Sequence, residues 1–390
     1  NFTAGIYHIV SVDTGANTWT MDANVASGVG AAMVGRMGGS VATVKHACEA
    51  TTAVAGNTIW VKNEGTDHEA AASITMVIGT AASNCTVVRG YGSTRGDSTK
   101  AVLKCTAASV TIFLGANSTS IENLDLQGNG QTTAKGAALT GISQFARDCK
   151  FSGFNSSGCN VTQTRSGLYD CEVTTSTGST AALVLTAGQA VNCKIHANAN
   201  HGVLLTDGNL INCVVVDNTG ASNDGVVIVH GLIANCTIAN NGRDNINGTG
   251  TVRANVYFNN VLSHPVRYNL NQVNWLSGGS SYYSYYRYNF FWVGAGSANI
   301  NGMTVAGDNV TLSGDPFTDE NAGDYTLNNT AGAGAACKSV GYPASVPPGA
   351  MLSYPDGGAL QHQDAGSATV HVSAGLTTVP IYGPGLAVGY

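Results

Sequence analysis

Apolar and polar positions in the middle of the chain repeat as an apolar residue, any residue, Asn or Asp, Cys, any residue and another apolar residue. The pattern occurs five times, and its cysteines are 22, 22, 20 and 23 residues apart. A fixed period of roughly 20–50 residues is typical of a solenoid, in which each turn buries its apolar face against its neighbours. The repeat therefore predicts stacked turns that carry Cys149, Cys171, Cys193, Cys213 and Cys236.

Each repeat predicts short strands that meet at a corner. Leu210 and Cys213 are three residues apart, yet both should face the core, which a straight strand does not allow. Asn212 lies between them, and Asn is the residue that, after glycine, best tolerates a left-handed backbone. Short parallel strands with Asn-marked corners favour an all-β fold, a right-handed parallel β-helix (solenoid).

The cysteine position is interpreted as a structural core ladder. Ten cysteines would suggest disulfides in a secreted protein. Cysteines at the same point of successive turns would instead stack about 4.8 Å apart as a column of small buried side chains. Leu124 and Val256 are interpreted as filling this position in the flanking turns, which a disulfide partner would not allow. We therefore expect free thiols in this column, and we expect no metal site in the chain.

The amino-terminal part of the chain departs from the repeat. Residues 1–36 alternate apolar and polar positions around turn signals, which predicts a β-hairpin module that continues upstream. From Ser40, which can cap the start of a helix, the apolar residues then fall at helical spacing: Val41, Val44, Ala47 and Cys48. This short N-terminal capping α-helix would cover the open apolar end of the first turn.

The repeat fades after Asn260, where a segment dense in aromatic residues follows. We group this segment with the capping helix and the β-helix as residues 37–297. Residues 298–390 are predicted to form a C-terminal β closure or extension. Small β elements are therefore expected at both ends of the chain. Aromatic side chains suit a packed flap, a subunit interface or a glycan-binding surface. The binding or interface candidates are Tyr282, Tyr283, Tyr285, Tyr286, Tyr288 and Trp292.

Composition limits the partners. Only 10% of the residues are charged, against roughly 25% in an average soluble protein, while 43% are hydrophobic, which excludes a disordered chain. The net charge is −6, and the 17 Lys and Arg form no basic stripe, so no nucleic-acid partner is expected. No run of about 18 apolar residues occurs, so no membrane span is expected.

Several motifs resemble those of the right-handed parallel β-helix superfamily, the pectate-lyase-like group of pectate lyases, polygalacturonases, alginate lyases and bacteriophage tailspikes. They are the turns, the capping helix and residues 87–92 (Val-Val-Arg-Gly-Tyr-Gly). Residues 315–327 and 356–361 resemble the C-terminal signature of bacterial surface and phage β-helix proteins, and residues 2–10 resemble an N-terminal module of phage structural proteins. The resemblance implies architecture rather than chemistry, since this fold hosts catalysts, adhesins and inert spacers.

Signatures of catalysis are sparse. Lyases of this fold need a Lys or Arg base and often Ca²⁺ held by several carboxylates, and glycosidases need paired acids. Residues 120–260 hold nine carboxylates without an Asp-Asp pair or a dense acidic cluster, and the lyase Asp-His and Arg-x-x-Arg signatures are missing. We expect no cofactor, and Ca²⁺ would be bound only if the chain is a lyase. Whether the chain is an enzyme stays open, and the missing signatures favour a chain without enzyme activity.

A few polar residues are weak candidates for chemistry. Asp207 and His230 each lie six residues before a cysteine in adjacent turns, so they could form an acid–base pair or a structural hydrogen bond. Lys150, Glu172 and Lys194 each follow a repeat cysteine and should stack outward, as a surface ion ladder or with a lysine as a lyase base. The remaining charged turn residues, which suit a metal or sugar groove or solvated loops, are Asp217, Asp224, Arg243 and Asp244. We expect His196 and His201 to point to solvent.

Three functional hypotheses follow. The leading one is a non-catalytic structural β-helix, extracellular, on a cell surface or in a virion as a tail spike or fibre, that serves assembly or attachment. Its partners would be copies of itself, other structural subunits or cell-surface polysaccharide. The second is a polysaccharide lyase or glycoside hydrolase of the same fold, and the third is a self-assembling filament subunit.

Overall fold

The computed structural model describes residues 9–13, 18–21, 44–48, 56–63, 67–76, 85–178, 181–220, 222–249, 255–271, 285–292, 294, 298–301, 308–338, 340 and 356–361. Contacts divide the chain into two units, Asn1–Val41 and Ala42–Tyr390. In the first unit, β1 (Ile9–Asp13) and β2 (Thr18–Met21) form an antiparallel hairpin in which Val12 pairs with Trp19. No helix in the described part of the chain is long and apolar enough to cross a membrane.

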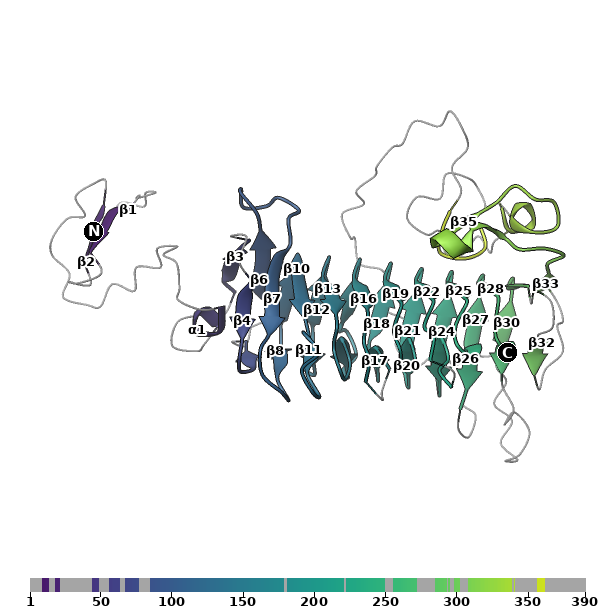
Figure 1. The fold of residues 1–390 in the computed structure, drawn as a ribbon, viewed down its shortest axis with the longest axis horizontal. Coiled ribbons are helices and arrows are strands. Elements are labelled where there is room, and N and C mark those ends of the chain that lie inside the picture. Colours follow the sequence, from purple (N-terminus) through teal and green to yellow (C-terminus); the bar gives the residue numbers. More distant parts are fainter. Residues whose placement is uncertain are drawn as a thin grey trace, which may run out of the picture. The chain divides into compact units, whose positions relative to one another are not determined.

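The second unit is a solenoid of three parallel sheets, in which every third strand belongs to the same sheet (Figure 1). Sheet 1 contains β3 (Thr58–Lys62), β6 (Thr86–Tyr91), β9 (Thr119–Glu122), β12 (Gln144–Arg147), β15 (Gly167–Tyr169), β18 (Gln189–Val191), β21 (Gly208–Ile211), β24 (Gly231–Ala234), β27 (Val256–Phe258) and β30 (Tyr285–Arg287).

Sheet 2 contains β4 (His68–Ala70), β7 (Ala101–Cys105), β10 (Leu124–Gln127), β13 (Lys150–Ser152), β16 (Glu172–Thr174), β19 (Lys194–His196), β22 (Val214–Val216), β25 (Thr237–Ala239), β28 (Val261–Ser263), β31 (Phe290–Phe291) and β33 (Val310–Thr311). Sheet 3 contains β5 (Ile74–Thr75), β8 (Thr111–Leu114), β11 (Lys135–Leu139), β14 (Cys159–Val161), β17 (Leu183–Leu185), β20 (Val203–Leu205), β23 (Val226–Ile228), β26 (Asp244–Gly248), β29 (Tyr268–Asn271) and β32 (Ala298–Asn301). The predicted all-β, right-handed parallel β-helix is confirmed.

The corners between sheets 1 and 2 have the predicted left-handed backbone. Asp170, Asn192 and Asn212 have φ values of 55°, 56° and 52°. Their side chains also bond along the solenoid: Asn192 Nδ2 donates to Asp170 Oδ1 at 3.1 Å, and Asn212 Nδ2 donates to Asn192 Oδ1 at 2.7 Å. The Asn or Asp of the repeat therefore turns the chain, and in the turns of Asp170, Asn192 and Asn212 its side chain also links one turn to the next.

The interior column of cysteines (the thiol column) passes into a column of asparagines. All ten cysteines are free thiols, and the five of the repeat are buried. Because Thr237 pairs with Val261, the residue after Cys236 in this column is Asn260. The prediction that Val256 holds this place is wrong: Val256 pairs with Leu232 in sheet 1, because this turn is longer than the repeat period.

Asn260, Asn289 and Asn309 form a hydrogen-bonded amide ladder. Asn260 Oδ1 accepts from the Cys236 N–H at 2.8 Å, Asn260 Nδ2 donates to Asn289 Oδ1 at 2.8 Å, and Asn289 Nδ2 donates to Asn309 Oδ1 at 3.0 Å. The parallel register thus continues to β33, although the sequence repeat fades after Asn260, because amides replace thiols without a change of geometry.

The amino-terminal end of the solenoid is covered by α1 (Val44–Cys48), which contacts β3 and β5. Cys48 is buried in the main core, and Val44 packs against that core. This placement follows from the apolar spacing of the helix, because its buried side faces the first turn. The expected capping helix is therefore present, although it is only five residues long.

Residues 308–338 and 356–361, here called the C-terminal layer, cover part of sheet 2. Within it, β34 (Phe317–Asp319) and β35 (Asp324–Leu327) form an antiparallel hairpin that encloses η1 (Glu320–Ala322), and η2 (Gly334–Cys337) follows. Phe317 and Tyr325 pack edge to face, 5.2 Å apart, over an outward face that includes Val214, Val216, Val261 and Phe290. Figure 1 shows this layer beside β25 and β28.

The Asp-Gly-Gly-Ala-Leu-Gln motif docks on the same face. The Gly358 N–H donates to the Asn259 carbonyl at 2.8 Å, and the Ala359 N–H donates to Thr237 Oγ1 at 3.1 Å. A Cβ at Gly357 would lie 2.5 Å from the ring of Phe290, so no larger residue fits there without a shift. The motif is therefore a close-contact seam between this layer and the solenoid.

Candidate functional site

Sheet 2 carries a charged row on the part of its outward face that precedes the C-terminal layer. Strand register aligns Asp125, Lys150, Glu172 and Lys194 on four successive strands. The alternating stack predicted for the last three is confirmed, and Lys150 Nζ lies 3.4 Å from Glu172 Oε2. The prediction that His196 points to solvent is wrong, since its Nε2 lies 2.9 Å from Glu172 Oε1 on the preceding turn.

Two carboxyls in the charged row have opposite pKa shifts. Burial raises the pKa of Asp125, whose Oδ2 accepts from Gln127 Nε2 at 2.9 Å while Oδ1 is buried without a hydrogen bond. Burial also acts to raise the pKa of Glu172, but its hydrogen bond with His196 and the charge of Lys150 outweigh burial and lower it. The row therefore holds one carboxyl that takes up a proton readily and one that keeps its charge.

Asp207 and His230 meet at the corner between sheets 3 and 1. Asp207 follows β20 and His230 follows β23, and Asp207 Oδ1 is bonded to His230 Nδ1. Their side chains are 43% and 29% exposed, so solvent reaches both. The geometry brings the pair together, and its catalytic role stays a prediction.

Two of the other predicted charged residues, Asp224 and Asp244, are less exposed to solvent than expected. Asp224 and Asp244 are buried, so the idea that they are solvated loop charges is wrong. Arg243 donates to both Asp224 oxygens, at 2.7 Å and 2.5 Å, and Arg267 pairs in the same way with Asp244. Each buried carboxylate is therefore neutralised by an arginine that begins the next turn, which fits a structural role.

One further residue, His201, joins this cluster, and Asp217 does not. His201 Nδ1 accepts from the Asp224 N–H at 2.9 Å, so the ring does not simply point to solvent as predicted. Burial lowers the pKa of His201 despite the nearby Asp224 charge, which keeps the ring neutral. Asp217 lies elsewhere: its Oδ1 accepts from Asn240 Nδ2 at 2.7 Å and from the Tyr325 hydroxyl at 2.6 Å, so it holds the C-terminal layer.

Sheet 1 carries an outward row that the sequence reasoning missed. Register aligns five residues on successive strands, here called the aromatic–arginine row: Trp60, Arg89, Glu122, Arg147 and Tyr169. The signal was present in the repeat, because Arg147 and Tyr169 each stand two residues before a repeat cysteine. It was overlooked because two residues do not make a periodic pattern.

Arginines stack on the rings of this row. The Arg147 guanidinium carbon lies 5.1 Å from the Tyr169 ring centre and 5.4 Å from that of Phe145. At the other end, Arg89 lies 5.5 Å from the Trp60 ring centre and is also paired with Glu122. The row thus presents partly exposed aromatic rings with fixed cations beside them.

The described part of the predicted aromatic segment is built into the solenoid. Tyr282 and Tyr283 lie outside the described residues, as does the side chain of Tyr285, whose backbone is in β30. Tyr286 packs against the main core, and Tyr288 occupies a corner with a φ of 58°. Trp292 packs against the C-terminal layer and lies edge to face with His264, 4.1 Å away. The described residues of the aromatic segment therefore form a further turn of the solenoid.

Comparison with known proteins places the architecture. No family model matches the chain, and no curated protein matches it. The crystal structure of pectate lyase Pel9A superposes with a TM-score of 0.62 at 14% identity, covering 82% of this chain and 91% of that one. The chain has the pectate-lyase-like parallel β-helix fold. At this identity the likeness concerns the fold alone.

Two other solved structures are more distant. The enzymatically active domain of bacteriophage CBA120 tailspike protein 2 matches with a TM-score of 0.35 at 10% identity, covering 66% of this chain and 43% of that one. The Azotobacter vinelandii mannuronan C-5 epimerase AlgE6 A-module matches with a TM-score of 0.24 at 12% identity, covering 72% of this chain and 96% of that one.

Proposed function

We propose that the chain is a non-catalytic β-helix that attaches to acidic polysaccharide through the aromatic–arginine row of sheet 1. The observation that carries this proposal is the stacking of Arg147 on Tyr169, on an outward face that also holds Trp60 with Arg89, whose guanidinium is already paired with Glu122. Aromatic faces suit the apolar faces of sugar rings, and a guanidinium pairs with carboxylates in a bidentate manner. Attachment at the exterior of a cell or a virion, as a copy in a homo-oligomer, belongs to the same proposal.

Attachment without catalysis is supported by the state of the charged groups. Lys150 and His196 are both bonded to Glu172, and the buried Asp224 and Asp244 are neutralised by arginines. A catalytic base must be able to reach a substrate proton, whereas these groups spend their bonding capacity on neighbouring turns. Ion pairs along the solenoid are what a rigid scaffold needs.

Affinity electrophoresis of the purified chain in gels containing a panel of acidic and neutral polysaccharides tests the proposal. We expect retardation by an acidic polysaccharide and at least a tenfold loss of affinity in Arg147→Ala and Tyr169→Ala, about 1.4 kcal/mol each. The matched control is Tyr268→Ala, since Arg267 stacks on Tyr268 at 5.1 Å on sheet 3, away from the row. Equal losses in all three variants, or no retardation, would rule out the proposed surface.

A second candidate, a polysaccharide lyase or glycoside hydrolase, is favoured by one observation, the opposite pKa shifts of Asp125 and Glu172. Their strands are two apart, so their Cα atoms are about 10 Å apart, a spacing compatible with an acid and a base on either side of a sugar. Depolymerisation assays decide between the two. Cleavage that is lost in Asp125→Asn or Lys150→Ala would establish an enzyme, and cleavage lost in Asp207→Ala or His230→Ala would place the chemistry at that pair.

A further inference from the structure

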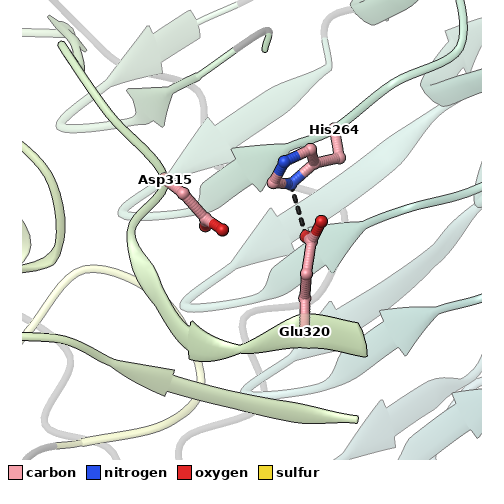
Figure 2. A group of neighbouring side chains, drawn as sticks. All are labelled: His264, Asp315 and Glu320. Atoms are coloured by element: carbon pink, nitrogen blue, oxygen red, sulfur yellow. Dashed lines mark ion pairs between the residues drawn. The ribbon is translucent and has the colours of Figure 1, made fainter. Parts of the chain in front are cut away.

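Three side chains with metal-binding chemistry meet where the C-terminal layer reaches the solenoid. His264 follows β28 at a left-handed corner with a φ of 46°, while Asp315 and Glu320 belong to the C-terminal layer. One ligand atom from each lies within 4.8 Å of the others. Figure 2 shows the imidazole and the two carboxylates turned toward one another from separate segments of the chain.

The arrangement of each side chain is fixed by its surroundings. The His264 ring is held edge to face against Trp292, and Asp315 Oδ1 accepts from the Phe317 N–H at 2.9 Å. The Glu320 side chain is only 14% exposed. The donors are therefore positioned by a ring contact, a turn and burial, which lowers the entropic cost of collecting them around an ion.

The charges of this group are not balanced by the described residues. His264 Nδ1 pairs with Glu320, which accounts for at most one of the two carboxylates, and the described salt bridges give neither Asp315 nor Glu320 a lysine or an arginine. The paired oxygen, Glu320 Oε2, is buried, and its ion-pair contact with His264 Nδ1 lacks the geometry of a hydrogen bond. Two carboxylates in a half-buried place that share one histidine call for a cation.

We propose that His264, Asp315 and Glu320 bind one divalent transition-metal cation, of which Zn²⁺ is the model, and that this ion clamps the C-terminal layer to the solenoid. Imidazole together with carboxylates suits Zn²⁺ and its neighbours better than Ca²⁺ or Mg²⁺, which prefer oxygen ligands alone. Ligand atoms about 2.1 Å from a tetrahedral ion lie about 3.4 Å apart, so small side-chain rotations suffice. Three protein ligands leave a fourth position for water.

The bound ion would hold a part of the C-terminal layer that differs from those held by its other polar contacts to the solenoid. The hydroxyl of Tyr325 on Asp217 and the seam at Gly358 hold other parts of the layer. The ion would fix the start of the hairpin, because Asp315 precedes β34 and Glu320 follows it. The site is independent of the polysaccharide surface on sheet 1, so either proposal can fail alone.

Titration of the metal-free full chain with Co²⁺, followed by absorption spectroscopy and then by competition with Zn²⁺, tests the site. We expect one equivalent to bind with d–d bands of nitrogen and oxygen ligands and without a thiolate-to-cobalt charge-transfer band, which separates this site from the ten thiols. Asp315→Asn and Glu320→Gln preserve the side-chain shapes and should each weaken binding at least tenfold. Zn²⁺ should also slow proteolysis of the C-terminal layer in the wild type but not in these variants.

The matched control is Asp207→Asn, which alters a His–carboxylate pair that has the same contact but lies on the solenoid wall. This variant should bind Co²⁺ like the wild type. Binding that survives both Asp315→Asn and Glu320→Gln, binding with a thiolate band, or no binding of Co²⁺, Zn²⁺ or Mn²⁺ would overturn the proposal and leave His264 and Glu320 as an ion pair only. Because two variants carry the test, failure of one to fold does not remove it.

Discussion

The outward face of sheet 2 differs between its two parts. Successive strands present Lys150, Glu172 and Lys194 in the first part, and the same register position holds Val214 and later Phe290 in the second. The first part is charged, and the second lies beneath the C-terminal layer. The backbone pairing of the strands is the same in both parts. The two parts therefore differ only in whether the outward residue is charged or apolar, and the apolar residues lie where another layer covers the solenoid.

The largest expected effect comes from removing the cover. Phe317→Ala deletes a buried ring of the C-terminal layer, and burial of this kind is worth about 3–5 kcal/mol. We expect the layer to detach before the solenoid unfolds, which native-state proteolysis followed by mass spectrometry would show. Tyr169→Ala, on an uncovered face, should cost less than about 1 kcal/mol. Equal protease sensitivity of the two variants would contradict the distinction between the two faces.

A smaller effect separates the two parts of the interior column. Asn289→Ala removes an amide whose oxygen accepts from the N–H and Nδ2 of Asn260 and whose nitrogen donates to Asn309. The orphaned groups should lower the free energy of unfolding by about 3 kcal/mol. Cys193→Ala removes only one buried sulfur and should cost about 1 kcal/mol. Urea titration measures both, and similar values would mean that the amide ladder contributes no more than the thiol column.

Asp125→Asn should stabilise the charged part of the sheet. Because the folded pKa of Asp125 is raised, the carboxyl favours folding only below its unfolded pKa of about 3.9, and this contribution is lost as the pH rises through the folded pKa. At pH 7 the charged carboxylate therefore opposes folding, and Asn should raise the free energy of unfolding by up to about 1 kcal/mol. Thermal unfolding from pH 3 to pH 7 checks this, and the gain should disappear at the acidic end.

The smallest expected effect belongs to Glu172. Its folded pKa is lowered, so it stabilises the fold above an unfolded pKa of about 4.3, and this contribution is lost as the pH falls through the folded pKa. Glu172→Gln should cost about 0.5 kcal/mol at pH 7 in low salt and less at high salt, as for exposed ion pairs. A larger, salt-independent loss would show that the open row is held by more than surface ion pairs.

The sequence was informative where structure is local and periodic. The spacing of the repeat cysteines predicted the β-helix, the left-handed corner at Asn212 and the stacking of Lys150 on Glu172, because one turn fixes the register of the next. It misplaced Val256 because a longer turn shifted the register after Cys236. A period counted along the chain fails wherever a loop changes length.

Long-range contacts were beyond the sequence pattern. The hydroxyl of Tyr325 bonds to Asp217 across 108 residues, and no periodicity relates the two. Burial of Asp224 was also unpredicted, because it depends on Arg243 reaching back from the following turn. Trp60 and Arg147 share a row only once the register of all the intervening strands is known. Such features follow from the folded solenoid, not from any one repeat.

The amide ladder has a mechanical consequence. Its hydrogen bonds, like those of the three sheets, run from turn to turn, so tension along the solenoid axis would separate the turns one after another. The cysteine-lined turns carry links of the same kind at another position, since Asn198 Nδ2 donates to Asn218 Oδ1 at 2.8 Å and Asn218 Nδ2 donates to Asn241 Oδ1 at 2.9 Å. Side-chain amides therefore reinforce backbone pairing in both parts of the solenoid, and a chain stretched in this way should resist separation of its turns in both.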